Sequence, residues 1–541
     1  MDDRIHEPAI DIEAIRWERI NLIIEGRVAN RTAGDAFDPA SLRLVHAERD
    51  GDVPPTHASI VDGCLTLRIN VMQGPDLQPL TPGHWRLVVA APGVGLRVGD
   101  PGRLADPTLA VTFRLRRGVF SARPMLDHHG RLVLDVGFER RAGFDHRGGF
   151  VRRLRSRATH PLGALRGSIL RGLVRSFKAL PGESGPRILF SSDTGASLSG
   201  NLKAVHDRMV ERGLHHRYHL DVLLRGGPTR ERTLGERLRL PWRLATADVI
   251  VIDDFQPVIH RFGDHPGVRI IQLWHAAGAF KTVGYSRVGK PGGPDPYSRV
   301  HKNYTYAIVS SDHDVRFYSE AFGIREARVV PTGIPRMDRF FDPAAAAAGL
   351  RAAHAAFPAS DGRFTILFAP TFRGETPRDA TYDLSRIDYA ALHAVCVEKD
   401  AVVIIRMHPF VTEPLAIPAA CADRILDGST TALDVNDLLF AVDLLVTDYS
   451  SIVFEFSTLG RPMLFYAWDL EDYIAGRDFY EPFESFVPGR IVSTFPELLD
   501  AIRRNEYEAD KVAEFATRHF AHLDGGASDR VIDELILDKA G

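Results

Sequence analysis

Two serines stand where an apolar strand gives way to a helix. The apolar run Leu438 to Val446 predicts a buried strand, Thr447 and Asp448 begin a polar turn, and a helix-compatible segment follows Ser450 and Ser451. The first turn of a helix leaves backbone N–H groups unpaired and carries partial positive charge, which suits a phosphate group. A plain N-cap accounts for the same residue types. The pattern therefore predicts either a phosphate site or an ordinary cap.

Two histidines occupy similar positions elsewhere in the chain. His275 ends the apolar stretch that starts at Arg269, and His408 ends the stretch that starts at Val402. The carboxyl ends of parallel strands border the ligand crevice of open α/β sheets. A neutral imidazole can take a proton from a hydroxyl near pH 7, whereas Arg406 beside His408 suits phosphate oxygens. A purely structural role is the other interpretation of each histidine.

Five blocks in this order resemble the CDP-glycerol glycerophosphotransferases, which are teichoic-acid and capsule polymerases with a GT-B fold. The blocks are Leu273-Trp274-His275 followed by Lys281, Pro331 to Asp338, Leu367 to Arg373, Arg406 to Pro409, and Thr447 to Glu455. The resemblance covers roughly residues 185 to 525. It departs from the family in two places: LWHAAG stands where LWHGT is usual, and Glu455 stands where Asp is usual.

The resemblance implies a transfer from a CDP-polyol, most simply CDP-glycerol, to a hydroxyl of a lipid-linked acceptor, with release of CMP. His275 is then the base that deprotonates the acceptor, while His408 approaches the donor phosphate. Glu455 holds the polyol hydroxyls of the donor or orients His408. Donor binding is assigned to the remaining polar residues of these blocks, which are Arg373, Arg406, Asp448, Ser450 and Ser451. Phosphoryl transfer needs positioning and charge neutralisation more than covalent chemistry.

The acceptor is expected against the first of two sheets. Ser192, Asp193 and Asn201 follow the first strand of that sheet, and Lys281 follows His275, so all four are candidates for acceptor binding. A turn and an N-cap are the simpler explanation for each of the first three. Arg336 and Asp338 suit a cleft ion pair or a structural bridge. No metal site and no cofactor are predicted, since adjacent Asp253 and Asp254 point to opposite faces of a strand.

Composition limits the class of protein. At 541 residues the chain is expected to form two or three domains, and an apolar fraction of 45% allows a large core. A net charge of −3 argues against a nucleic-acid binder, and three scattered cysteines suit a reducing compartment. The beginning of the chain lacks an apolar signal segment, and no apolar run is long enough to cross a bilayer. The protein is predicted to be cytoplasmic and peripheral on the inner membrane face.

Four segments are predicted along the chain. Residues 1–120 show short alternating strands separated by Gly, Pro and Asp turns, typical of a β sandwich with an accessory role. Residues 121–184 form a linker, and residues 185–345 and 346–541 alternate strands with helices. Such alternation predicts two doubly wound parallel sheets, the first for the acceptor and the second for the donor nucleotide. The fold class is thus α/β, with a GT-B-like pair of sheets after an all-β domain.

The linker carries a basic amphipathic stretch. Between residues 151 and 180 there are eight Lys or Arg residues and no acid, with apolar residues at helical spacing. Such a helix suits an anionic membrane surface, and an interdomain helix packed on a neighbour is the alternative. For the whole chain, two other functions stay open: a GT-B enzyme that uses a nucleotide sugar, and a non-catalytic protein that binds a surface polymer.

Overall fold

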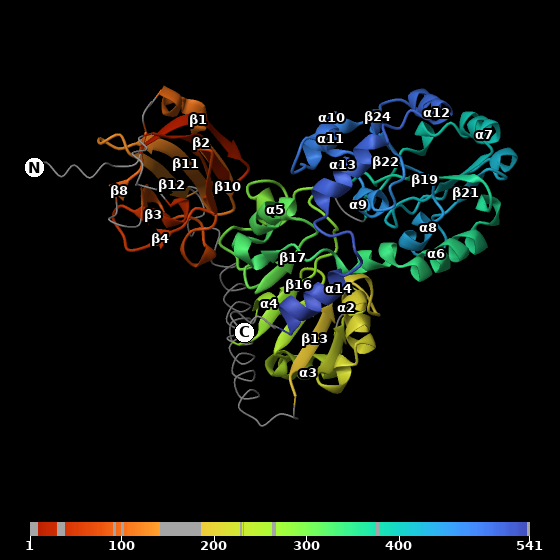
Figure 1. The fold of residues 1–541 in the computed structure, drawn as a ribbon, viewed down its shortest axis with the longest axis horizontal. Helices are drawn as coiled ribbons and strands as arrows, with labels where there is room; N and C mark the ends of the chain where they lie inside the picture. Colours follow the sequence, from red (N-terminus) through yellow and green to blue (C-terminus); the bar gives the residue numbers. More distant parts are fainter. Residues whose placement is uncertain are drawn as a thin grey trace, which may run out of the picture.

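The computed structural model (Figure 1) describes most of the chain. The described residues are 9–29, 38–89, 94–98, 102–140, 185–227, 230, 232–261, 267–374 and 378–537. The basic stretch 151–180 lies outside them, so its two interpretations stay predictions. Within the described residues, none of the helices combines the length and the apolar character that crossing a bilayer requires.

The N-terminal unit is all β and is drawn in red and orange in Figure 1. One of its sheets has the strand order β5-β6-β2-β1-β9 and the other β10-β11-β12-β7-β3-β4, with β8 beside β7. The strands are β1 (Ala9–Glu18), β2 (Asn21–Ala29), β3 (Leu42–His46), β4 (Asp52–Val53), β5 (His57–Val61), β6 (Cys64–Asn70), β7 (Gly83–Val89), β8 (Val94–Gly95), β9 (Arg97–Val98), β10 (Val111–Leu115), β11 (Gly118–Leu126) and β12 (Leu132–Arg140).

Alternation of buried and partly exposed residues along the strands builds the core of this unit. In β6 the residues Leu65, Leu67 and Ile69 are buried, while Thr66 and Arg68 between them are partly exposed. One face of the strand therefore covers the core shared with the other sheet. The boundary expected at residue 120 falls inside β11, and β12 pairs with both β11 and β7. We therefore place the end of the described β unit at Arg140.

The next unit is a six-stranded parallel sheet, yellow to green in Figure 1, with the order β14-β13-β15-β16-β17-β18. Its strands are β13 (Arg187–Ser192), β14 (His219–Leu224), β15 (Val249–Ile252), β16 (Arg269–Gln272), β17 (Tyr306–Ile308) and β18 (Val329–Val330). Its helices are α2 (Gly200–Glu211), α3 (Leu234–Thr246), α4 (Pro257–Arg261) and α5 (Asp312–Phe322). We call this unit the N-half. The strand order reverses between β13 and β15, where a crevice opens in doubly wound sheets.

The C-half is a second six-stranded parallel sheet with the order β21-β20-β19-β22-β23-β24. Its strands are β19 (Phe364–Ala369), β20 (Ala401–Ile405), β21 (Ile425–Asp427), β22 (Leu444–Thr447), β23 (Met463–Tyr466) and β24 (Arg490–Val492). Its helices are α6 (Pro343–Ala356), α7 (Tyr389–Glu398), α8 (Val435–Leu439), α9 (Ile452–Ser457), α10 (Leu470–Gly476), α11 (Phe483–Phe486), α12 (Phe495–Arg504) and α13 (Asp510–His519). Here the order reverses between β19 and β22.

Two details differ from the sequence prediction. The apolar run from Leu438 is not one strand: its first two residues end α8, which Asp434 caps, and β22 begins only at Leu444. A buried helix end and a buried strand are equally apolar, so composition does not separate them. The boundary expected at residue 345 falls inside α6, which Asp342 caps at its first turn.

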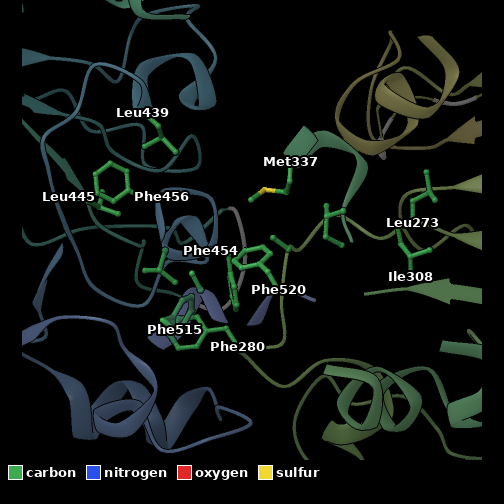
Figure 2. Close-up of a cluster of buried hydrophobic side chains, with 14 of the residues drawn as sticks. Leu273, Phe280, Ile308, Met337, Leu439, Leu445, Phe454, Phe456, Phe515 and Phe520 are labelled. Atoms are coloured by element: carbon green, nitrogen blue, oxygen red, sulfur yellow. The ribbon is translucent and has the colours of Figure 1, made fainter. Parts of the chain in front are cut away.

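The two halves share one apolar core. Figure 2 shows Leu273 and Ile308 from the N-half, Leu445 and Phe456 from the C-half, and Phe454 between the two groups. After α13 the chain returns to the N-half, where α14 (Ala527–Arg530) and the π-helical turn Val531–Ile536 follow. There Asp529 accepts hydrogen bonds from Arg208 and Arg212 of the α2 region. The last segment of the chain therefore ties the C-half to the N-half.

Candidate active site

The predicted site residues gather at the carboxyl ends of both sheets, next to the points where strand order reverses. In the N-half, Asp254 follows β15 and His275 follows the adjacent strand β16. In the C-half, Thr371 follows β19 and Asp448 follows the adjacent strand β22. Parallel pairing brings each of these pairs of loops to one edge of its sheet.

His275 has the surroundings of a general base. Its imidazole is 60% exposed, with Nδ1 3.9 Å from Oδ1 of Asp254. Loss of hydration lowers the pKa of His275, Asp254 opposes that change, and the charge of Arg336 lowers the pKa further. The imidazole is therefore neutral near pH 7 and able to accept a proton. Sequence reasoning did not pair it with Asp254, although both residues follow neighbouring parallel strands.

A tight turn presents this histidine. Trp274 has a φ of +52°, which is strained for a bulky side chain, and its ring stacks on His275 with centroids 4.4 Å apart. Asn201 donates hydrogen bonds to the carbonyls of Leu273 (3.1 Å) and Trp274 (2.8 Å), and its Oδ1 accepts from the backbone N–H of Arg336 (3.0 Å). Asn201 is only 2% exposed. It therefore positions the turn, and its role in acceptor binding stays a prediction.

The other two candidates after β13 are also held by local contacts. Ser192 is buried, with its Oγ 2.8 Å from the hydroxyl of Thr194. Asp193 forms ion pairs with Arg232 (2.7 Å) and Arg225 (3.4 Å). These contacts match the turn interpretation of the segment. Burial raises the pKa of nearby Asp253 to about 6.

In the C-half, Asp448 joins two loops. Its Oδ1 accepts hydrogen bonds from the N–H (2.7 Å) and hydroxyl (2.6 Å) of Thr371 and from the N–H of Tyr449 (2.6 Å). Its Oδ2 accepts from Arg373 at 3.0 Å, and Arg373 also binds both carboxylate oxygens of Asp469 (2.5 and 2.9 Å). Asp448 and Arg373, two of the predicted donor-binding residues, therefore form hydrogen bonds and ion pairs within the protein. Two carboxylates pair with Arg373, so this residue orders the loops, and its contact with the donor phosphate stays a prediction.

Three basic side chains instead form what we call the cation cluster: Lys281, Arg477 and His408. Burial lowers the pKa of Lys281 to about 7, with Asp448 opposing the change and Arg477 adding to it. Burial, together with the charges of Lys281 and Arg477, also lowers the pKa of His408. Among the described residues, no carboxylate forms an ion pair with Lys281 or Arg477. Lys281 was predicted to bind the acceptor, yet the structure places it with residues of the C-half.

Local contacts orient the cluster. Nδ1 of His408 accepts from the N–H of Phe410 at 3.2 Å, which leaves Nε2 for a ligand. Arg477 donates to the carbonyl of Gly374 at 2.9 Å and lies over the ring of Phe372. The ammonium of Lys281 lies 5.3 Å from the ring centroid of Tyr473. Sequence reasoning missed Arg477 because no motif surrounds it.

The remaining predicted donor-binding residues are Arg406, Ser450 and Ser451, which lie outside the cation cluster. Arg406 donates to the carbonyl of Leu433 at 2.8 Å, and its buried Nη1 has no partner within the described residues. The Oγ of Ser450 accepts from the N–H of Ile452 at 3.3 Å, and exposed Ser451 is the N-cap of α9. Because α9 has only six residues, its dipole is small. Any phosphate contact here depends on the hydroxyl and N–H groups themselves.

An ion pair links the two halves beside the site. Arg336 of the N-half binds Oε1 of buried Glu455 on α9, and Oε2 of Glu455 has no partner within the described residues. Arg336 and Asp338 are therefore not a pair with each other. Asp338 instead accepts from the N–H groups of Ala527 (2.9 Å) and Ser528 (2.8 Å) at the start of α14. Glu455 does not contact His408 as one prediction had it, but Oε2 can still accept a hydroxyl.

Known proteins match this chain over the two halves. A family model described as CDP-Glycerol:Poly(glycerophosphate) glycerophosphotransferase matches residues 175–537. The chain belongs to this family. The family match begins after the β unit, so residues 1–140 lie outside it. The sequence resemblance is thereby confirmed.

Individual relatives agree. Teichoic acid ribitol-phosphate polymerase TarK of Staphylococcus aureus is 47% identical over 64% of this chain and 68% of its own. TarL, a ribitol-phosphate polymerase of the same organism, is 43% identical over 68% of this chain and 65% of its own. The chain thus spans about two thirds of each relative. The solved wall teichoic acid polymerase TagF aligns with a TM-score of 0.56 at 22% identity, over 72% of this chain and 98% of that one. This likeness confirms the predicted GT-B-like fold.

Proposed function

We propose that the protein transfers a polyol phosphate from a CDP-polyol to a hydroxyl of a polyol-phosphate acceptor and releases CMP. The observation that carries this proposal is the cation cluster. Lys281 comes from the N-half, and Arg477 and His408 come from the C-half. Lys281 and Arg477 repel each other, and Asp448, the carboxylate that favours the charged form of Lys281, is already bonded to Arg373 and Thr371. The cluster therefore suits an anion that binds between the halves. The pyrophosphate of the donor is such an anion.

His275 and the cation cluster suit the two ends of the proposed reaction. The acceptor hydroxyl attacks the phosphorus that bears the polyol, and His275 takes the proton of that hydroxyl. A new P–O bond forms to the acceptor, the P–O bond to the bridging oxygen breaks, and CMP leaves with the bonding electrons. The cation cluster neutralises the charge that develops on the leaving phosphate. Asp254 stabilises the imidazolium of His275 once it has formed.

For the polyol we propose ribitol in place of the glycerol that the family resemblance suggested. Four relatives that are 36–47% identical are named for ribitol phosphate, whereas those named for glycerol phosphate are 25–28% identical. Glu455 has one free carboxylate oxygen near the cleft, which suits a hydroxyl of either polyol. Glycerol phosphate is the second candidate.

The test is CMP release by the full chain. CDP-ribitol, CDP-glycerol and several nucleotide sugars are each offered with a polyol-phosphate oligomer on a lipid-like anchor. We expect CMP with CDP-ribitol above CDP-glycerol and no product from nucleotide sugars. His275→Asn should lower kcat by about 10²- to 10⁴-fold, while His215→Asn, an exposed histidine, serves as the control. Transfer from a nucleotide sugar, or binding without any turnover, would overturn the proposal in favour of one of the two alternatives.

The lipid-linked acceptor implies a site at the inner membrane face, and we propose peripheral attachment there. The basic stretch 151–180 supports it by composition alone, through attraction to anionic lipid headgroups. Flotation of the full chain with anionic vesicles, compared with neutral vesicles, tests the attachment. Neutralising the arginines of this stretch should abolish flotation, and unchanged flotation would contradict the assignment.

A further inference from the structure

Three potential metal ligands meet where α5 of the N-half faces α13 of the C-half. His313 and Asp314 lie in the first turn of α5, and His519 is the last residue of α13. One ligand atom from each residue lies within 4.8 Å of the others. About two hundred residues separate Asp314 from His519 in the sequence, so no short motif predicts the cluster.

The polar atoms of this cluster lack partners. The side chain of His519 is 1% exposed, and neither of its ring nitrogens has a hydrogen-bond partner within the described residues. Oδ1 of fully buried Asp314 is likewise unpartnered and lies 3.9 Å from Nδ1 of His519. Burying a polar group without a partner costs free energy, and buried groups of this kind are nearly always satisfied. The unsatisfied atoms point to a ligand that binds them together.

Aromatic rings enclose His519 on its other sides. The ring centroids of Phe515, Phe486 and Phe454 lie 4.3, 5.2 and 5.5 Å from that of the imidazole. Figure 2 shows Phe454 and Phe515 side by side between the two halves. Such a shell leaves the imidazole facing the ring of His313, at 5.2 Å.

Neighbouring groups orient the proposed ligands. Nε2 of His313 lies 3.0 Å from a carboxylate oxygen of Glu481, and Oδ2 of Asp314 accepts from the hydroxyl of Ser310 at 3.0 Å. A histidine ligand commonly donates its second N–H to a carboxylate, which fixes the ring and increases its basicity. With Nε2 bound to Glu481, Nδ1 of His313 is the nitrogen available for coordination.

We propose that His313, Asp314 and His519 bind one Zn²⁺ ion, with water as a fourth ligand. Two imidazoles and one carboxylate are a donor set that zinc takes in proteins, with bonds of about 2.0–2.2 Å. Ligand atoms around a tetrahedral zinc ion are then about 3.4 Å apart, so the side chains need to close by up to roughly 1.4 Å. The carboxylate of Asp314 offsets the unfavourable positive end of the helix dipole at the start of α5.

The ion has a structural role that is separate from the proposed transfer reaction. It joins α5 to α13 just before the chain crosses back to the N-half, where the N–H of Ala521 donates to the carbonyl of Ser310 at 2.9 Å. His519 also packs on Phe454, the neighbour in sequence of Glu455, which binds Arg336. Zinc therefore holds the two halves in the arrangement in which that ion pair forms.

The test is metal content of the purified, tag-free full chain after dialysis against Zn²⁺ and then against metal-free buffer. We expect about one zinc ion per chain. His519→Phe suits the surrounding phenylalanine rings, and Asp314→Asn changes little in shape; each should weaken zinc affinity by at least about tenfold. His522→Phe alters an exposed histidine of the same segment and should keep the zinc.

Thermal unfolding gives a second readout that needs no activity. Zinc should raise the unfolding temperature of the wild type and of His522→Phe, and leave that of His519→Phe and Asp314→Asn unchanged, because a ligand stabilises only the state that binds it. Far-UV circular dichroism shows whether both variants fold. Wild-type protein without stoichiometric zinc, or zinc retained by both folded variants, would overturn the proposal.

Discussion

At the level of single residues, the pKa values of Lys281 and His275 are both lowered, which favours their neutral forms. The consequences for the proposed reaction are opposite. Burial and neighbouring cations lower the pKa of Lys281 to about 7, so part of its charge is absent at neutral pH. A bound pyrophosphate restores that charge. The lowered pKa of His275 keeps the imidazole unprotonated at the same pH. In the proposed reaction, the free enzyme thus has a proton acceptor ready, and its phosphate site weakens as pH rises.

The pH dependence of kcat/KM for the donor should therefore be bell-shaped. Activity is lost below the lowered pKa of His275 because the base becomes protonated, and it falls above about pH 7 because Lys281 loses its proton. Lys281→Arg should remove the high-pH fall, since a guanidinium keeps its proton. Steady-state kinetics from pH 5 to 9 provide the measurement, with exposed Lys203→Arg as the control. An unchanged high-pH limb in Lys281→Arg would show that another group titrates there.

At the level of elements, the proposed donor side is built from two loops that one carboxylate joins. Asp448 follows β22 and binds Thr371, which follows β19, and these strands are neighbours at the switch point of the sheet. Arg373 extends the connection to Asp469. The loops hold their geometry because these polar groups are buried and each is paired, so a missing hydrogen bond is felt throughout the network.

Thr371→Val should test this network. The substitution keeps the shape of the side chain and removes the hydroxyl bond to a carboxylate, at a cost of about 1.5–3 kcal/mol, and the donor KM should rise. Thr447→Val removes a neutral bond to the carbonyl of Ala369 (2.7 Å) in the same sheet and should cost about 0.5–1.5 kcal/mol. Urea midpoints and donor KM are measured for both variants. Equal effects would mean that Asp448 does not organise the donor side.

At the level of the whole molecule, the β unit is fixed to the N-half by buried charge. Arg19 binds both carboxylate oxygens of Glu320 on α5 (2.6 and 3.1 Å), and Asn21 donates to the same group. A second pair joins Arg68 and Glu326 at 2.6 Å. Glu320 is only 3% exposed, so its charge depends on these partners. The β unit is thereby held as a rigid neighbour of α5.

Removing Arg19 should loosen that attachment. Arg19→Ala leaves the buried carboxylate of Glu320 without its main partner, which costs roughly 3–5 kcal/mol. We expect faster proteolytic cleavage between the β unit and the N-half under native conditions. Arg27→Ala removes an exposed pair with Glu13 (2.8 Å) and should change little. Identical cleavage rates for the two variants would contradict the role of the buried pair.

Local patterns in the sequence were sufficient for the fold class and for the sheet edges at which the candidate site residues lie. Apolar strands that end in His275, His408 or Ser450 place these residues at sheet edges, because parallel strands all end on the same side. Five ordered blocks identified the family, and the match of the family model to residues 175–537 confirms it. These features depend on neighbours in the chain, so they can be read without knowing the packing.

Only the tertiary structure decided which side chains meet. Arg373 is neutralised by Asp469, about a hundred positions away, and Arg336 pairs with Glu455 instead of nearby Asp338. Lys281 belongs to the N-half but lies beside Arg477 of the C-half in the cation cluster. No sequence motif surrounds Arg477. A periodic pattern fixes the edge or face on which a residue lies. The partner across an interface depends on how two separately folded sheets pack, and that information is spread over the whole core.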